Sequence, residues 1–186
     1  VKNMDNYGVQ LPASSSGNTI NGNILSGNGT GIYVTRSSGN TITGNISQQN
    51  NLYGIFLFTV AINNTISGNN TNSNGNSGIL LQTSSIYNTI AGNSSSGNVN
   101  GIYLSNSSNN TVTGNTANTN SGGGINVDTS NYTTVVGNTA ISNTTYGIFL
   151  TNGSASNAIS GNTLVSNGTG LYVGASFHNS FTGNTI

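Results

Sequence analysis

The sequence has almost no charged residues. Its 186 residues include four formal charges, Lys2, Arg36, Asp5 and Asp128, whereas about a quarter of a typical soluble domain is charged. Without a basic patch to neutralise phosphates or anionic headgroups, we expect neither nucleic-acid binding nor membrane-surface binding. The near absence of charge also removes the repulsion that keeps molecules apart, which favours self-association.

Cysteine is absent and histidine occurs once. The chain therefore has neither a disulfide framework nor a thiolate metal site, and we expect no cofactor and no metal. His178 has no acidic residue or cysteine nearby in sequence, so we interpret it as a solvated turn residue. No run approaches the roughly 18 apolar residues of a membrane span, so we expect no membrane insertion.

Two motifs instead repeat along the chain with one shared period of 22–24 residues. The first is Asn-Thr-Ile-x-Gly-Asn, with glycines Gly22, Gly44, Gly68, Gly92, Gly114, Gly137, Gly161 and Gly183. The second is Gly-Ile-x-Leu/Val, beginning at Gly8, Gly31, Gly54, Gly78, Gly101, Gly124, Gly147 and Gly170. Eight copies of two interleaved motifs exclude a random polar sequence.

Both motifs alternate apolar and polar residues, as β-strands with one buried face do. In Gly31-Ile32-Tyr33-Val34, for example, Ile32 and Val34 point one way and Tyr33 the other. No helical spacing is sustained, and the glycine content would destabilise helices. We predict an all-β fold, a single-stranded parallel β-helix of about eight coils with three short strands per coil. Residues 1–186 would form one domain, either a segment of a longer chain or an open-ended assembly unit.

Asparagine recurs at two fixed positions of each repeat. Because its amide both donates and accepts hydrogen bonds, identical side chains stacked at strand spacing can bond along a column. The predicted ladders consist of Asn23, Asn45, Asn69, Asn93, Asn115, Asn138 and Asn162, and of Asn28, Asn50, Asn74, Asn98, Asn120, Asn143 and Asn167.

The two motifs, present over essentially the whole chain, resemble the parallel β-helix repeats of NosD-like and related carbohydrate-binding and sugar-hydrolase domains. These domains are common in secreted and cell-surface proteins of archaea and bacteria. The resemblance implies a right-handed helix and an extracellular or cell-surface location. It indicates fold far more than activity, because unrelated activities share this scaffold.

The sequence offers no pair of carboxylates of the kind that β-helix enzymes acting on polysaccharides use. Asp5 lies in the first coil and Asp128 in the sixth, about 24 Å apart at strand spacing. An acid and a base that share one substrate must lie closer together. We therefore expect no active site and predict that the protein is not an enzyme.

Two outward columns are candidate contact surfaces. A mostly aromatic column is a candidate for sugar stacking or for packing between molecules; it consists of Tyr33, Phe56, Tyr103, Phe149 and Tyr172. A threonine column resembles the flat face of ice-binding β-solenoids, although threonine also simply favours strands; it consists of Thr19, Thr41, Thr65, Thr89, Thr111 and Thr134.

Sequons at predicted turns are candidate glycosylation sites: Asn63, Asn106, Asn109, Asn131 and Asn152. Taken together, these features predict a non-catalytic structural β-helix, the building block of a cell-surface filament, sheath, surface layer or adhesin stalk. Its main partner would be further copies of itself. The alternatives are a carbohydrate-binding β-helix module and an ice-binding β-solenoid.

Overall fold

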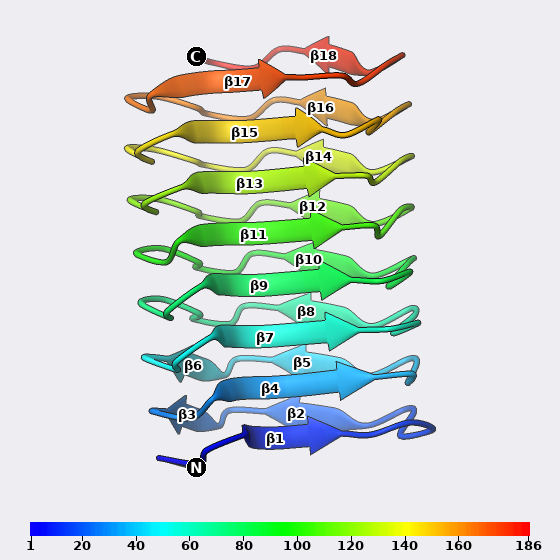
Figure 1. Cartoon of the computed structure of the whole chain (residues 1–186), viewed down its shortest axis with the longest axis vertical. Helices are drawn as coiled ribbons and strands as arrows, with labels where there is room; N and C mark the ends of the chain where they lie inside the picture. Colours follow the sequence, from blue (N-terminus) through cyan, green and yellow to red (C-terminus); the bar gives the residue numbers. More distant parts are fainter.

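The chain winds into a right-handed parallel β-helix in which each coil lies directly on the preceding one (Figure 1). The structure, a computed structural model, describes all 186 residues. It contains strands, turns and bends but no helix, so no helix is available to cross a membrane. The predicted fold class is confirmed.

The widest surface, called sheet 1, is an eight-stranded parallel sheet built from the Gly-Ile-x-Leu/Val motif. Its strands, in spatial order, are β1 (Tyr7–Leu11), β4 (Thr30–Thr35), β7 (Tyr53–Phe58), β9 (Ser77–Gln82), β11 (Asn100–Ser105), β13 (Gly123–Asp128), β15 (Tyr146–Thr151) and β17 (Thr169–Val173).

The opposite surface, sheet 2, is an eight-stranded parallel sheet built from the Asn-Thr-Ile motif. Its strands are β2 (Thr19–Asn21), β5 (Thr41–Thr43), β8 (Thr65–Ser67), β10 (Thr89–Ala91), β12 (Thr111–Thr113), β14 (Thr134–Val136), β16 (Ala158–Ser160) and β18 (Ser180–Thr182).

A third surface joins sheet 2 to the next strand of sheet 1. It consists of β3 (Ile24–Ser26) and β6 (Ile46–Gln48). Beyond β6 the same position continues as single parallel bridges, from Ile46 to Asn70 and onward coil by coil to Thr185. Each coil thus contributes three parallel ladders, as expected.

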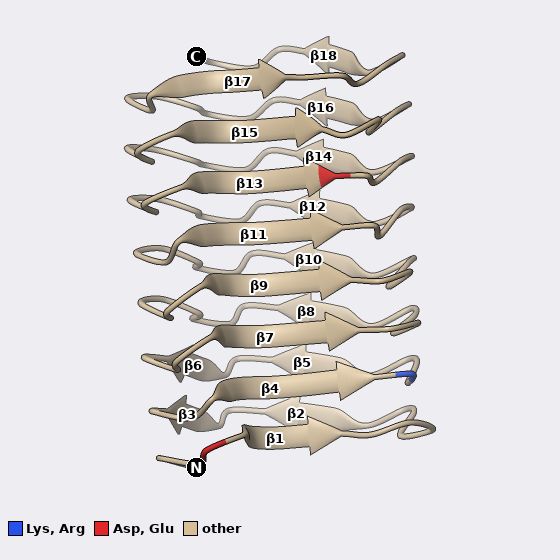
Figure 2. Ribbon diagram, viewed as in Figure 1, with Lys and Arg blue, Asp and Glu red and all other residues tan.

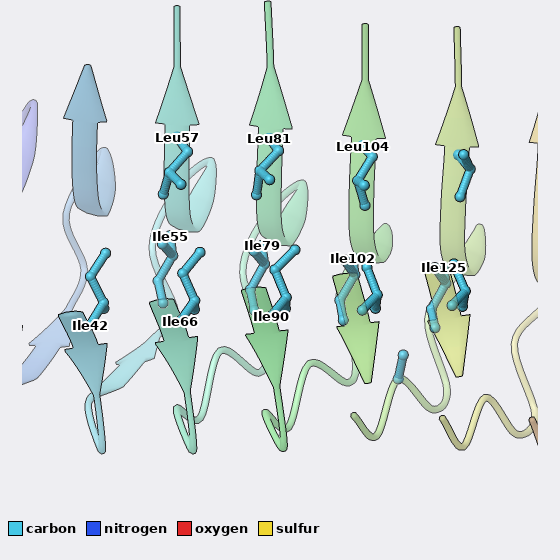
Figure 3. Close-up of a cluster of buried hydrophobic side chains, with 14 of the residues drawn as sticks. Ile42, Ile55, Leu57, Ile66, Ile79, Leu81, Ile90, Ile102, Leu104 and Ile125 are labelled. Carbon is cyan, nitrogen blue, oxygen red and sulfur yellow. The ribbon is translucent and has the colours of Figure 1, made fainter. Parts of the chain in front are cut away.

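The core is a narrow stack of like residues between sheets 1 and 2 (Figure 3). Ile42 pairs in register with Ile66, and Ile66 with Ile90, and all three are fully buried. On the facing sheet, Ile55 pairs with Ile79 in the same way. Burying each such side chain stabilises the fold by roughly 1.5–3 kcal/mol, so the stacked apolar columns of both sheets hold the two sheets together.

Glycine is required at the corner that follows each strand of sheet 2. The eight motif glycines there have φ between 61° and 67°, the left-handed region that favours glycine. This corner turns the chain so that the following Asn side chain enters the interior. The repeat therefore encodes both the turn and the ladder that stabilises it.

Candidate functional site

Polar side chains inside the rod are used for structure. Asn45 is typical: its Oδ1 accepts from the backbone N–H and the side-chain Nδ2 of Asn23, at 2.9 and 3.0 Å. Its Nδ2 donates to Ile20 O at 2.9 Å and to Asn69 Oδ1 at 3.0 Å. The second column of Asn residues pairs similarly, with Asn120 Nδ2 donating to Asn143 Oδ1 at 2.9 Å. These amides are hydrogen-bonded within the rod, so the candidate sites are on its outer faces.

Sequence reasoning missed a third asparagine ladder, formed by the first residue of the Asn-Thr-Ile motif. Its members are Asn18, Asn40, Asn64, Asn88, Asn110, Asn157 and Asn179, with Thr133 replacing asparagine in one coil. Asn40 Nδ2, for instance, donates to Asn64 Oδ1 at 3.0 Å. The recurrence of asparagine at this position of the motif could have predicted the ladder from the sequence.

The threonine column lies on the outer face of sheet 2 and keeps perfect register from Thr19 to Thr134. It continues as Ala158 and Ser180. The neighbouring column holds Asn21, Thr43, Ser67, Ala91, Thr113 and Val136. This face carries no ring and no charge, and ice binding by it stays a prediction.

The aromatic column lies on the outer face of sheet 1, where two clusters of rings occupy opposite ends. The N-terminal aromatic cluster comprises Tyr7, Tyr33, Tyr53, Phe56 and Phe58. The C-terminal aromatic cluster comprises Tyr146, Phe149 and Tyr172. Ring centroids lie 4.4 Å apart in the Tyr7–Tyr33 pair and 4.5 Å apart in the Tyr146–Phe149 pair, both stacked. Aromatic residues from three columns of the sheet combine into the N-terminal cluster and from two columns into the C-terminal cluster.

Between the two clusters, the same face becomes polar. This central polar patch consists of Gln82, Asn100, Tyr103, Asn126 and Asp128, all half-buried on β9, β11 and β13. Asn126 Nδ2 donates to Asn100 Oδ1 at 2.8 Å. The Oδ1 of Asn126 accepts no hydrogen bond and lies against Gly123, where a Cβ atom would approach it to 2.1 Å.

Tyr103 and Asp128 form a titratable pair at the centre of this patch. Tyr103 Oη donates to Asp128 Oδ2 at 3.0 Å, while Asp128 Oδ1 accepts from Asn152 Nδ2 at 2.8 Å and Thr129 Oγ1 at 3.1 Å. Burial raises the pKa of the Tyr103 phenol, and the hydrogen bond and negative charge of Asp128 raise it further. The phenol is therefore held in its protonated, hydrogen-donating form.

Apart from Lys2 and Asp5, which both precede β1, the charges lie in different coils (Figure 2). Asp128 is at the end of β13, Arg36 follows β4 at an exposed corner, and Asp5 precedes β1. Lys2 pairs with Ser26 beside the third surface. His178 lies in a turn between β17 and β18. The structure has no enclosed pocket.

The sequon residues differ in exposure. Asn63, Asn106 and Asn152 are exposed, whereas Asn109 and Asn131 are half-buried. Asn131 Oδ1 accepts from Ala155 N at 2.7 Å, and the Asn152 amide is bonded to Asp128. Glycosylation stays a prediction, with Asn63 and Asn106 the most accessible acceptors.

The solved structures most similar to this chain include carbohydrate-active β-helices. The periplasmic alginate epimerase AlgG matches with a TM-score of 0.82 and 25% identity, over 97% of this chain and 48% of that one. The A-module of the Azotobacter vinelandii mannuronan C-5 epimerase AlgE6 matches with a TM-score of 0.66 and 20% identity, over 88% and 56%. The Dettilon tailspike protein matches with a TM-score of 0.53 and 23% identity, over 77% and 32%. The chain thus spans about half the length of AlgG. A search of curated proteins by sequence gave no match.

The similarity to AlgG overturns the expectation that this chain is not an enzyme. That expectation assumed that catalysis needs two carboxylates in neighbouring coils, and Asp5 and Asp128 lie in the first and sixth coils. A tyrosine can also serve as an acid or base, and Tyr103 lies within hydrogen-bond distance of Asp128. The pair was missed because Asp128 is offset diagonally, one coil and two residues from Tyr103.

The family model that matches this chain is described as periplasmic copper-binding protein (NosD). Copper in proteins prefers imidazole, thiolate and thioether ligands. The one histidine, His178, and the one methionine, Met4, lie in the last and first coils, and no three His, Cys, Asp or Glu side chains gather in the structure. The donor set therefore does not fit a copper centre within this chain.

The family match also bears on location, because both the family and AlgG are described as periplasmic. These relatives support a location outside the cytoplasm; exposure on a cell surface stays a prediction. The model matches residues 1–98 and 58–186, which together include every coil, and the chain belongs to the NosD family of parallel β-helix proteins.

Proposed function

We propose that the outer face of sheet 1 binds an extended polysaccharide along the axis of the rod. The observation that carries this proposal is the order of side chains on that face: an aromatic cluster, a polar patch and a second aromatic cluster. β7 and β15, at the inner edges of the two clusters, are four coils apart, about 19 Å. A chain of several sugar rings can contact all three parts at once.

Each part of the face has a chemical role in this proposal. Half-exposed rings such as Tyr33 and Phe56 offer apolar surface to the faces of sugar rings. Asn100, Tyr103 and Asp128 offer hydrogen-bonding groups to sugar hydroxyls between the clusters. The similarity to alginate epimerases supports a polysaccharide ligand, and the open shape of the face suits a long polymer rather than a small molecule.

Retention of the protein on columns of immobilised polysaccharide tests this proposal. Tyr33→Ala and Tyr146→Ala should each weaken binding up to about tenfold, because a ring contact contributes about 0.5–1.5 kcal/mol. Tyr87→Ala and Tyr132→Ala are matched controls, since both tyrosines are exposed at turns outside sheet 1. Equal retention of all four variants and the unsubstituted protein would refute binding by this face.

A second candidate function is catalysis on the bound polysaccharide, which the Tyr103–Asp128 pair favours. A phenol that is oriented by a carboxylate can donate its proton to a reacting sugar oxygen and regain a proton from solvent. Incubation with a panel of polysaccharides, followed by analysis of chain length and of sugar stereochemistry, tests this candidate. Any activity should be lost in Tyr103→Phe, which keeps the ring but removes the proton; activity unchanged in Tyr103→Phe would exclude the role.

Association of the chain with itself remains a prediction for the same face. The low charge and the exposed rings support it. Sedimentation velocity over a range of concentrations separates the two uses of the face. If the protein stays monomeric and binds polysaccharide, the result argues against assembly. If the protein self-associates and Tyr33→Ala abolishes that self-association, the result argues for assembly.

A further inference from the structure

The charges and hydrogen-bonding groups of sheet 1 also indicate which class of polysaccharide it accepts; this inference rests on the proposed function. Its outer face carries one formal charge, the carboxylate of Asp128, and no lysine or arginine. The closest cation along the face is Arg36, at the corner after β4. β4 and β13 are four coils apart, about 19 Å, well beyond the screening length of about 8 Å at physiological salt.

A polyuronate places a carboxylate on every sugar. Along this face, no cation would pair with those carboxylates, and one or more of them would approach Asp128. Two like charges about 5 Å apart at a protein surface repel each other. Proteins that recognise carboxylates instead supply arginine forks or lysines, and sheet 1 has neither.

The polar patch also combines one carboxylate with uncharged amides. Asp128 contributes two carboxylate oxygens, and Gln82, Asn100 and Asn126 contribute side-chain amides that can donate to or accept from sugar hydroxyls, except that the Oδ1 of Asn126 is buried. An ionised carboxylate can only accept hydrogen bonds, whereas a hydroxyl can also donate. The patch therefore matches hydroxyl-bearing sugars and mismatches uronates.

We propose that the ligand of sheet 1 is a neutral polysaccharide and that Asp128 excludes polyuronates. This separates the chain from the alginate epimerases that it resembles in fold, since alginate is a polymer of uronic acids. Neutral polymer should bind at least about tenfold more tightly than its uronate counterpart at low ionic strength. Added salt should weaken neutral binding little, because no ion pair is formed.

Matched polymers test the proposal: polygalacturonate against its methyl ester, and alginate against its propylene glycol ester, with xyloglucan and dextran as further neutral probes. Affinity is measured by retention on columns of each immobilised polymer for the unsubstituted protein, Asp128→Asn and Asp5→Asn. The ratio of uronate to neutral affinity should rise about tenfold in Asp128→Asn. It should not change in Asp5→Asn, the same substitution outside sheet 1.

The outcomes separate this inference from the proposed function. Tighter retention of the neutral polymer than of the uronate, with the ratio of their affinities changed by Asp128→Asn but not by Asp5→Asn, supports both the neutral preference and the proposed function. Uronate retained more tightly than its ester, with loss of binding in Tyr33→Ala, overturns the neutral preference but keeps the glycan-binding face. Retention of no polymer of either class, by folded protein, overturns the proposed function itself.

Discussion

Removing one rung of a buried asparagine ladder should destabilise the fold more than any surface substitution. Asn93, with 1% of its surface exposed, is the rung chosen. Its Oδ1 accepts from the N–H of Asn69 at 2.9 Å and from Asn69 Nδ2 at 3.0 Å. Its Nδ2 donates to Ile66 O at 3.0 Å and to Asn115 Oδ1 at 2.9 Å. Asn93→Ala removes all four hydrogen bonds and leaves a backbone N–H and a backbone carbonyl unpaired inside the rod.

Each hydrogen bond contributes about 1 kcal/mol net, and an orphaned buried group costs more. Asn93→Ala should therefore lower the free energy of unfolding by about 4 kcal/mol. Asn51→Ala is the control, because Asn51 is exposed and its side chain makes no hydrogen bond; it should change stability by at most about 0.5 kcal/mol.

Guanidinium-induced unfolding, followed by circular dichroism in the β-sheet region, measures both variants. A solenoid can lose coils locally, so unchanged steepness of the transition must be checked before free energies are compared. If Asn93→Ala and Asn51→Ala unfold at the same midpoint, the amides do not stabilise the stack, and the account of the ladders is wrong.

Three further predictions concern the core, the Tyr103–Asp128 pair and copper. Gly78→Ala should prevent normal packing, because the added Cβ would lie 2.8 Å from Thr71 O and would overlap Ser95 Oγ. In Gly68→Ala the added Cβ would contact no atom, and the substitution should cost about 1 kcal/mol because the residue has a left-handed backbone conformation. Thermal midpoints compare the two variants. The raised pKa of Tyr103 predicts a stabilising contribution that is complete below its ordinary value near 10 and is lost as pH rises through the higher folded pKa. Absorbance at 295 nm should therefore show a late-titrating tyrosine that disappears in Tyr103→Phe and titrates earlier in Asp128→Asn; an unchanged titration curve in both variants would contradict the pair. Cu(II) should not raise the thermal midpoint, because His178 and Met4 lie at opposite ends of the rod; a rise that is lost on substitution of His178 would show that copper binds.

The repeat made most of the fold predictable. A period that keeps Ile42, Ile66 and Ile90 in equivalent positions leaves few arrangements other than stacked coils, and the register of sheet 2 agrees with it. The third surface was predicted as a strand in every coil. Ile24–Ser26 and Ile46–Gln48 form strands there, and the later coils continue the same parallel ladder as single bridges.

The candidate site was predictable only in part. The outward direction of Tyr33 and Phe149 follows from alternation along a strand. The contact between Tyr103 and Asp128 depends instead on a diagonal between neighbouring coils, and a search for paired carboxylates does not detect it. The division of the face into two aromatic clusters required Tyr53, Phe58 and Tyr146, which belong to columns on either side of the predicted one.

Mapping the bound polysaccharide on the protein tests the central claim most directly. Nuclear magnetic resonance shifts of the backbone amides would be followed as a neutral oligosaccharide is added. We predict that the largest shifts arise from β4 and β7, from β15 and from residues near Asn126, in one continuous band along sheet 1. Shifts confined to the threonine column of sheet 2, or no shifts at the highest oligosaccharide concentration used, would contradict the assignment of sheet 1 as the binding face.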